Sequence, residues 1–220
     1  MVKEHNEKSA FGKALVLTVI LFLVGVSLGV FIESYRSNSI KDQYEELEFE
    51  LLDSKLRTNF YQLMGEDFCD IAVEDNLAFS DRIYEEGKKI EVYAKFNRLG
   101  DKLIEEKKKY TLLKTEFWLN SILLRDKCNE DYETVVYFYL DDPQEDNIKQ
   151  SQNVQSRILG DLKEKYGSEI MLIPLPTDLD VSVVNAFVEL NDITMFPTIL
   201  INEEIKLEGL HNLEDIEKLI

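Results

Sequence analysis

Few side chains in this 220-residue chain have types and spacings suited to catalysis or metal binding. The sequence contains two cysteines, Cys69 and Cys128, and two histidines, His5 and His211, and no spacing among them is typical of structural zinc. None of the nine glycines belongs to a GxGxxG or GxxxxGK phosphate loop. We therefore expect no metal and no cofactor, and the role of the two cysteines becomes the first question.

The charge of the chain is strongly acidic and unevenly spread. Against 25 Lys and Arg stand 43 Asp and Glu, which gives a net charge of −18 at pH 7. Residues 129–220 hold 6 basic and 20 acidic side chains and so carry −14 of that total. Because such a surface repels phosphate backbones, we expect no nucleic-acid partner and favour an unknown protein partner with a basic face.

Residues 14–32 form an uncharged apolar run that follows a short N-terminal tail over residues 1–13. As a helix this run would extend roughly 28 Å, close to the hydrocarbon thickness of a bilayer. A cleaved signal peptide has a shorter apolar core and a small-residue cleavage site, which is missing here. The run therefore predicts a single transmembrane anchor. Lys3, Lys8 and Lys13 precede it, which favours a cytoplasmic N-terminus and a C-terminal domain outside the cell membrane.

Small residues recur within the predicted membrane span. Gly25 and Gly29 form a GxxxG match, with Ser27 between them. Such residues allow two membrane helices to approach each other closely. Packing of two spans into a homodimer is one hypothesis for this match, and glycines merely tolerated in lipid are the simpler alternative.

Residues 33–128 contain no proline and read as a helical stalk, a hairpin or coiled coil of three helices. In the first helix, an amphipathic stripe is formed by Ile40, Tyr44, Leu47, Leu51, Leu56, Phe60 and Leu63. We expect that helix to end at Gly65. The segment Asn97–Gly100 is the turn signal between the second and third helices.

That turn predicts that the two cysteines lie close together. If the second and third helices are antiparallel about it, Cys69 lies opposite Cys128 at the open end of the hairpin. A disulfide on an oxidising side of the membrane would close a loop of roughly 60 residues and add about 4 kcal/mol of stability in the chain-entropy model. We predict this structural disulfide, with two unrelated buried thiols and a catalytic pair as alternatives.

Residues 129–220 have the pattern of a separate α/β domain. Apolar runs predict strands at 134–140, 170–173, 198–202 and 205–208, and helices are expected at 146–166, 178–190 and from 212 onwards. Asp178 or Asp180 is expected to cap the second of these helices. The predicted order is β-α-β-α-β-β-α, which right-handed crossovers restrict to few topologies.

One segment of this domain carries a family resemblance. Residues 195–201 read MFPTILI and stand just before the predicted hairpin. They resemble the cis-proline segment of the thioredoxin family, and the strand at 135–140 resembles the strand that leads into the active-site loop of that family. The resemblance covers about two fifths of the chain. It implies a thioredoxin-like fold in which Pro197, between Phe196 and Thr198, is cis and faces that loop.

The loop itself departs from the family pattern. Redox-active members carry C-x-x-C there, whereas this chain has Asp141, Asp142, Pro143, Gln144, Glu145 and Asp146. Disulfide exchange requires a thiolate, which carboxylates do not supply. Acids that complement the start of a helix are the simplest interpretation of this degenerate loop, and a weak calcium site is the alternative. The resemblance therefore implies a redox-inactive member.

Three functions follow from these patterns. The preferred one is a single-pass membrane protein whose thioredoxin-like domain acts as a protein-binding or chaperone-like module, with its groove at residues 196–198. A membrane-anchored thiol-disulfide oxidoreductase using Cys69 and Cys128 is the first alternative. A purely structural dimeric tether is the second.

Overall fold

The computed structural model describes residues 7–63, 68–96 and 101–220, and the chain divides into two compact units, Met1–Glu46 and Leu47–Ile220. Three helices come first: α1 (Glu7–Leu63), α2 (Cys69–Phe96) and α3 (Asp101–Cys128). The turn predicted at 97–100 and the helix end predicted at Gly65 lie outside the described residues.

The first unit contains the apolar part of α1. Within the described residues, Phe11–Ile32 is the one helical stretch long and apolar enough to cross a membrane, and its side chains are all exposed. Helix α1 continues past Ile32 without a break, so the span and the helix predicted after it form one element. A Cβ added at Gly25 or Gly29 would meet nothing within 4 Å. Pairing of two spans through Gly25, Ser27 and Gly29 stays a prediction.

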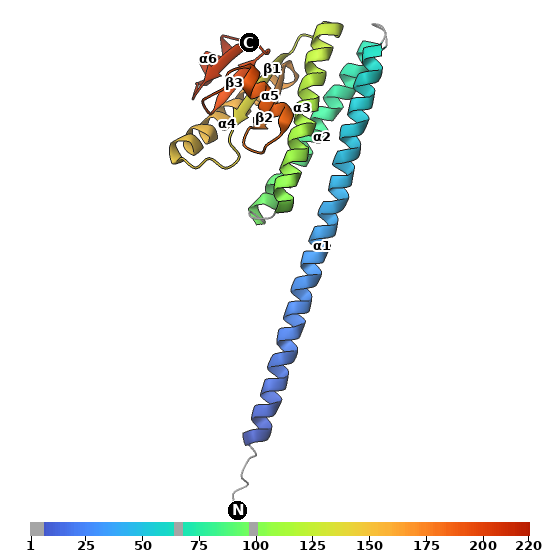
Figure 1. Cartoon of the computed structure of the whole chain (residues 1–220), viewed down its shortest axis with the longest axis vertical. Coiled ribbons are helices and arrows are strands. Elements are labelled where there is room, and N and C mark those ends of the chain that lie inside the picture. Colours follow the sequence, from blue (N-terminus) through green and yellow to red (C-terminus); the bar gives the residue numbers. More distant parts are fainter. Residues whose placement is uncertain (1–6, 64–67, 97–100) are drawn as a thin grey trace, which may run out of the picture. The chain divides into compact units, whose positions relative to one another are not determined.

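The second unit contains a mixed four-stranded sheet. After α3 the chain forms β1 (Glu133–Tyr139), α4 (Asp146–Tyr166), the 3-10 turn η2 (Gly167–Glu169), β2 (Ile170–Pro176), α5 (Ser182–Leu190), β3 (Thr198–Ile201), β4 (Ile205–Glu208) and α6 (Leu213–Glu217). The strand order is β2-β1-β3-β4. Strands β1, β2 and β3 are labelled in Figure 1. Strand β1 is parallel to β2 and antiparallel to β3, and β3 is antiparallel to β4.

Helices α4 and α6 cover one face of the sheet. Val135 and Tyr137 of β1 pack there in one buried cluster with Leu159 and Leu162 of α4 and Ile216 of α6. The alternation of side chains along a strand sends Val136 and the other intervening residues of β1 to the opposite face. Because the middle five residues of β1 are all buried, both faces of this central strand are covered.

Helix α3 covers the opposite face together with α5. The indole ring of Trp118 in α3 meets the Phe138 ring of β1 edge-on, with ring centroids 6.1 Å apart, and lies 4.3 Å from the Phe187 ring of α5. Leu113 and Ser121 of α3 are fully buried as well, because α2 packs along the same helix. The third helix expected in the stalk therefore forms one layer of the domain.

The last part of α1 faces its neighbours with polar side chains. The hydroxyl of Thr58 donates to Oδ1 of Asn120 in α3 at 2.6 Å, and Nδ2 of Asn120 donates to Oγ of the buried Ser54 at 3.1 Å. The Tyr61 hydroxyl donates to Asp75 of α2 at 2.6 Å. Hydrogen bonds and ion pairs thus hold α1 against α2 and α3, together with the Tyr61 ring, which packs on Phe68, Ala72 and Leu124.

The amphipathic stripe predicted for this helix is only partly buried. Leu51 is half-buried, whereas Leu56, Phe60 and Leu63 are exposed. The side chains of Ile40, Tyr44 and Leu47 lie outside the described set. The stripe prediction was wrong for the three exposed residues, because polar side chains occupy the face that docks on α2 and α3.

Candidate functional site

The loop that follows β1 is anchored by charged groups from α3 and from the connection between β2 and α5. The carboxylate of Asp178 accepts hydrogen bonds from the backbone nitrogens of Asp141, at 2.6 Å, and Asp142, at 2.9 Å. Lys107 of α3 donates to both carboxylate oxygens of Asp141, each at 2.7 Å. Asp178 therefore holds the loop and does not cap α5. The N-cap of α5 is Val181, without a side-chain hydrogen bond.

The loop side chains offer acids and an amide but no nucleophile. Four of the six are exposed, namely Asp142, Gln144, Glu145 and Asp146, while Asp141 and Pro143 are half-buried. Helix α4 begins with Asp146 in its first turn, where a carboxylate interacts favourably with the positive end of the helix. Within residues 7–63, 68–96 and 101–220, no three His, Cys, Asp or Glu side chains form a group suited to a metal ion.

A buried lysine lies close to Asp141 in the space between α3 and β2. Lys114 is 3 % exposed; its amine donates to the carbonyl oxygen of Pro174 and stands 4.7 Å from the centre of the Tyr110 ring. Burial lowers the pKa of Lys114 to about 7, and the negative charge of Asp141 offsets part of that effect. The sequence offered no signal for this residue, because lysine on a charged helix is usually solvated.

The Phe196–Pro197 peptide bond at the start of β3 is cis. The hydroxyl of Thr198 donates to the carbonyl oxygen of Met195 at 2.6 Å, and the carbonyl oxygen of Pro197 accepts from the backbone nitrogen of Gly209 at 2.7 Å. Pro197 and Thr198 are buried, Phe196 is half-buried and Met195 is 52 % exposed. The segment thus presents an apolar surface formed by Met195 and Phe196.

The cis-proline segment and the acidic loop lie at the same end of the sheet. Phe138 near the end of β1 is paired with Thr198 at the start of β3 in the antiparallel register. The loop begins two residues after the end of β1, and Pro197 immediately precedes β3. The fold therefore brings together the two groups of residues that the sequence singled out around Pro197 and Asp141.

The two cysteines form a disulfide, as predicted. The Cα atoms of Cys69 in α2 and Cys128 in α3 are 5.5 Å apart. The antiparallel pairing continues along the helices, where Nδ2 of Asn76 donates to Oγ of Ser121 at 3.1 Å. The half-cystines pack against a small apolar cluster that contains Phe68, Ala72, Leu124 and Tyr61.

This disulfide stands near the other end of the sheet from the acidic loop. Cys128 ends α3 and β1 begins at Glu133, whereas the loop follows the far end of that strand. A seven-residue strand extends roughly 23 Å at 3.3 Å per residue. Because the chain has no third cysteine, no thiol is present at the loop.

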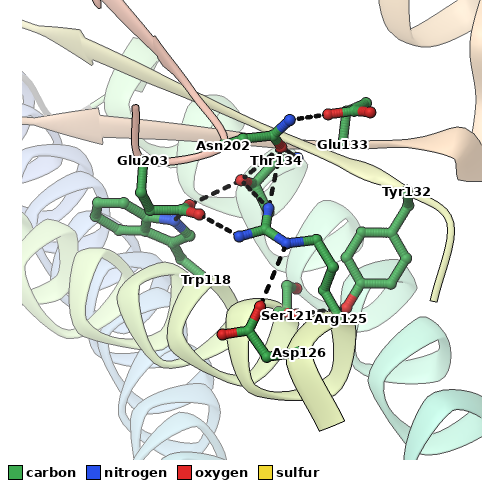
Figure 2. A network of polar contacts seen from close by, with 9 residues as sticks. All are labelled: Trp118, Ser121, Arg125, Asp126, Tyr132, Glu133, Thr134, Asn202 and Glu203. Atoms are coloured by element: carbon green, nitrogen blue, oxygen red, sulfur yellow. Dashed lines mark hydrogen bonds and ion pairs between the residues drawn. The ribbon is translucent and has the colours of Figure 1, made fainter. Parts of the chain in front are cut away.

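A polar network ties α3 to the β3–β4 turn, at the end of the sheet where β1 begins (Figure 2). The carboxylate of Glu203 accepts from Nε1 of Trp118 at 2.6 Å, Nη2 of Arg125 at 2.5 Å and the Thr134 hydroxyl at 2.7 Å. Asn202 Oδ1 accepts from Nη1 of Arg125 and from the backbone nitrogen of Thr134, both at 3.0 Å. Figure 2 shows these side chains converging between the helix and the turn.

The turn that carries Glu203 has an uncommon backbone. Asn202 and Glu203 have φ angles of 51° and 61°, in the left-handed region where hairpin turns usually place Asn and Gly. The backbone of a glutamate in this region is strained. The three hydrogen bonds that the Glu203 carboxylate accepts compensate for that strain. Sequence reasoning missed this network, because Arg125 and Glu203 are 78 residues apart.

The similarities of this chain to known proteins are to solved structures. No family model and no curated protein matches the chain. The chain is similar in structure to a thioredoxin-2 described as a component of malaria parasite protein secretion machinery (19 % identity, 41 % of this chain and 82 % of that chain, TM-score 0.34). It is also similar to chloroplastic thioredoxin z (15 % identity, 45 % and 84 %, TM-score 0.34). A third structure is the germline-specific thioredoxin Deadhead from Drosophila melanogaster (16 % identity, 46 % and 94 %, TM-score 0.32). Residues 133–220 have a thioredoxin-like fold, with this sheet order, helices on both faces and a cis-proline before β3.

Proposed function

We propose that this chain is a single-pass membrane protein whose thioredoxin-like domain binds an extended segment of a partner protein and performs no thiol chemistry. The observation that carries the proposal is the position of the two cysteines. The loop over residues 141–146 contains none, and the only two cysteines are joined in a disulfide near the opposite end of the sheet. Disulfide exchange at the loop has no thiolate to start it.

The surface beside the cis-proline supports binding of a peptide. Met195 and Phe196 present apolar area, and Gly209 adjoins them, with the position of its absent Cβ 3.7 Å from the Met195 sulfur. The exposed carboxylates of Asp142 and Glu145 belong to the loop at the same end of the sheet. An apolar surface with acidic neighbours suits a partner segment that combines apolar and basic side chains.

The disulfide supports an oxidising location for the domain. Such bonds persist outside the cytoplasm and are rare within it. We therefore place the C-terminal domain on the extracytoplasmic side, as the lysines before the span favour. A C-terminal alkaline phosphatase fusion tests this orientation: activity of the fusion supports it, and a fusion that is inactive although well expressed contradicts it.

The binding site is tested by capture of partner proteins from native membranes. Phe196→Ala should reduce capture, because it removes apolar area beside Pro197, while Val154→Ala on the exposed side of α4 is the matched control. Capture should also weaken as salt is raised, because exposed charges are screened beyond about 10 Å at 0.1 M ionic strength. Equal capture by the Phe196→Ala variant and the wild type would contradict binding of the partner at this surface.

A further inference from the structure

One face of α1 in the second unit is apolar and exposed. It is formed by five residues, here named the outer stripe: Phe49, Leu52, Leu56, Phe60 and Leu63, each between 54 % and 86 % exposed. At 3.6 residues per turn, these positions fall within a sector of roughly 80° on the helix surface. The stripe is therefore one continuous apolar surface along four turns of the helix.

The opposite face of the same segment is the polar one. Ser54, Thr58 and Tyr61 direct hydroxyl groups toward α2 and α3, and Arg57 pairs with Asp75 of α2 at 3.2 Å. A helix on the surface of a monomer normally has the reverse arrangement, with its apolar side inward. An apolar outer face on α1 is expected if that face is buried in an interface of the assembled protein.

We propose that the outer stripe pairs with the outer stripe of a second copy of this chain. With a full surface of roughly 200 Å² for each large apolar residue, the stripe exposes about 600 Å². A symmetric pair would bury about 1,200 Å² in total, which reaches the lower limit of a specific protein interface. The area of about 600 Å² that one copy exposes is at the upper end of the apolar patches found on monomeric proteins.

The chemistry of the stripe favours a second copy over another partner. A two-fold interface must be complementary to itself, and an uncharged apolar surface satisfies that condition without matching charges. Two copies that each carry −18 repel through most other surfaces, whereas the stripe itself contains no charged side chain. Pairing this face therefore buries apolar area without bringing acidic groups into contact.

The membrane anchor favours pairing of two copies. This step rests on the anchor of the proposed function, which holds two chains in one bilayer. Leu56 is the middle residue of the stripe, so it lies near its own counterpart across a two-fold axis whether the two helices are parallel or antiparallel. Anchoring in a shared plane also raises the local concentration of one copy around the other, which helps an interface of modest area.

The first test is oxidative crosslinking of the full chain in lipid vesicles. Leu56→Cys places a thiol in the stripe, and Lys55→Cys places one at the adjacent position, which is also exposed but lies off the stripe. The proposal predicts a covalent dimer at residue 56 at least roughly tenfold more abundant than at residue 55. Equal yields at the two positions would overturn it.

The second test measures dissociation of the full chain in detergent by analytical ultracentrifugation. Leu56→Lys should raise the dissociation constant at least roughly tenfold, since each copy loses one buried leucine at the interface. Gln62→Lys adds the same charge off the stripe and should leave the constant unchanged. A wild type that stays monomeric, or a dimer unaffected by Leu56→Lys, overturns the proposal; the latter points to pairing elsewhere, such as Gly25 and Gly29.

These tests are independent of the proposed peptide-binding surface beside Pro197. Residues 49–63 belong to α1, whereas partner capture is tested at Phe196. A wild type that stays monomeric but captures partners normally would reject the stripe alone, and a wild type that dimerises through the stripe but whose capture is unchanged by Phe196→Ala would reject the peptide-binding surface alone. Far-UV circular dichroism and retention of the Cys69–Cys128 disulfide show in each variant that the chain is folded.

Discussion

Nη2 of Arg125 in α3 lies 2.5 Å from Oε2 of Glu203 in the β3–β4 turn. Both side chains are about three-quarters buried, and the indole of Trp118 donates to the other oxygen of the same carboxylate. The pair joins the last helix of the N-terminal helical region to the far hairpin of the sheet. It is one reason why α3 is a layer of the thioredoxin-like domain rather than a separate stalk.

Removal of that carboxylate should weaken the whole unit. Glu203→Ala removes the acceptor of Nε1 of Trp118 and of Nη2 of Arg125 and the nearer acceptor of the Thr134 hydroxyl. The free energy of unfolding should therefore fall by about 2 kcal/mol. Urea unfolding of the detergent-solubilised chain measures this, with the fluorescence of Trp118, the only tryptophan, as the probe. Glu204→Ala at the adjacent exposed position is the control and should be close to neutral. Equal stability of the two variants would show that the network contributes nothing.

The disulfide should contribute a comparable amount. Replacing both Cys69 and Cys128 by serine should reduce the free energy of unfolding by about 2–4 kcal/mol, because the bond closes a long loop in the unfolded chain. Mass spectrometry of the intact protein after alkylation without reductant should show no modified thiol. A purified native protein with two alkylated cysteines would contradict the bonded state.

Thiol exchange should be absent from the native protein. An insulin-reduction assay should give the same background rate for the wild type and for Cys69→Ser, because the acidic loop has no thiolate and the disulfide is packed among apolar side chains. An active thioredoxin serves as the positive control. A rate that falls in the Cys69→Ser variant would instead support the oxidoreductase alternative.

The buried Lys114 should make stability depend on pH. Its pKa is lowered to about 7 in the folded protein, chiefly by burial, from 10.5 in the unfolded chain. The unfolded state therefore binds more protons between these values, and stability should rise with pH from about 7 upwards, by at most about 1.4 kcal/mol per pH unit.

Substitution of this lysine isolates its contribution. Lys114→Met should flatten the rise in the free energy of unfolding between pH 7 and pH 9, whereas Lys149→Met at an exposed position of α4 should retain it. Urea unfolding at several pH values provides the measurement. A slope unchanged in the Lys114→Met variant would mean that the amine does not titrate in this range.

The sequence by itself determined the features that depend on local pattern. The apolar run up to Ile32 is long enough to span a bilayer whatever packs around it. An antiparallel hairpin about residues 97–100 was enough to place Cys69 opposite Cys128, because helical rise fixes the register of two paired helices. The short apolar runs and their spacing likewise indicated the strands of the α/β domain. The segment at residues 195–201 supplied the resemblance to the thioredoxin family.

Only the tertiary structure decided which faces of those elements are covered. An amphipathic pattern does not say which neighbour a helix meets, so the sequence did not show that α3 is buried by both α2 and the sheet. Nor did it show that polar hydroxyls turn the apolar side of α1 outward. The contacts of Glu203 with Arg125 and of Asp178 with the loop join residues distant in sequence. These side chains come within hydrogen-bond distance only when the strands and helices that carry them have packed together.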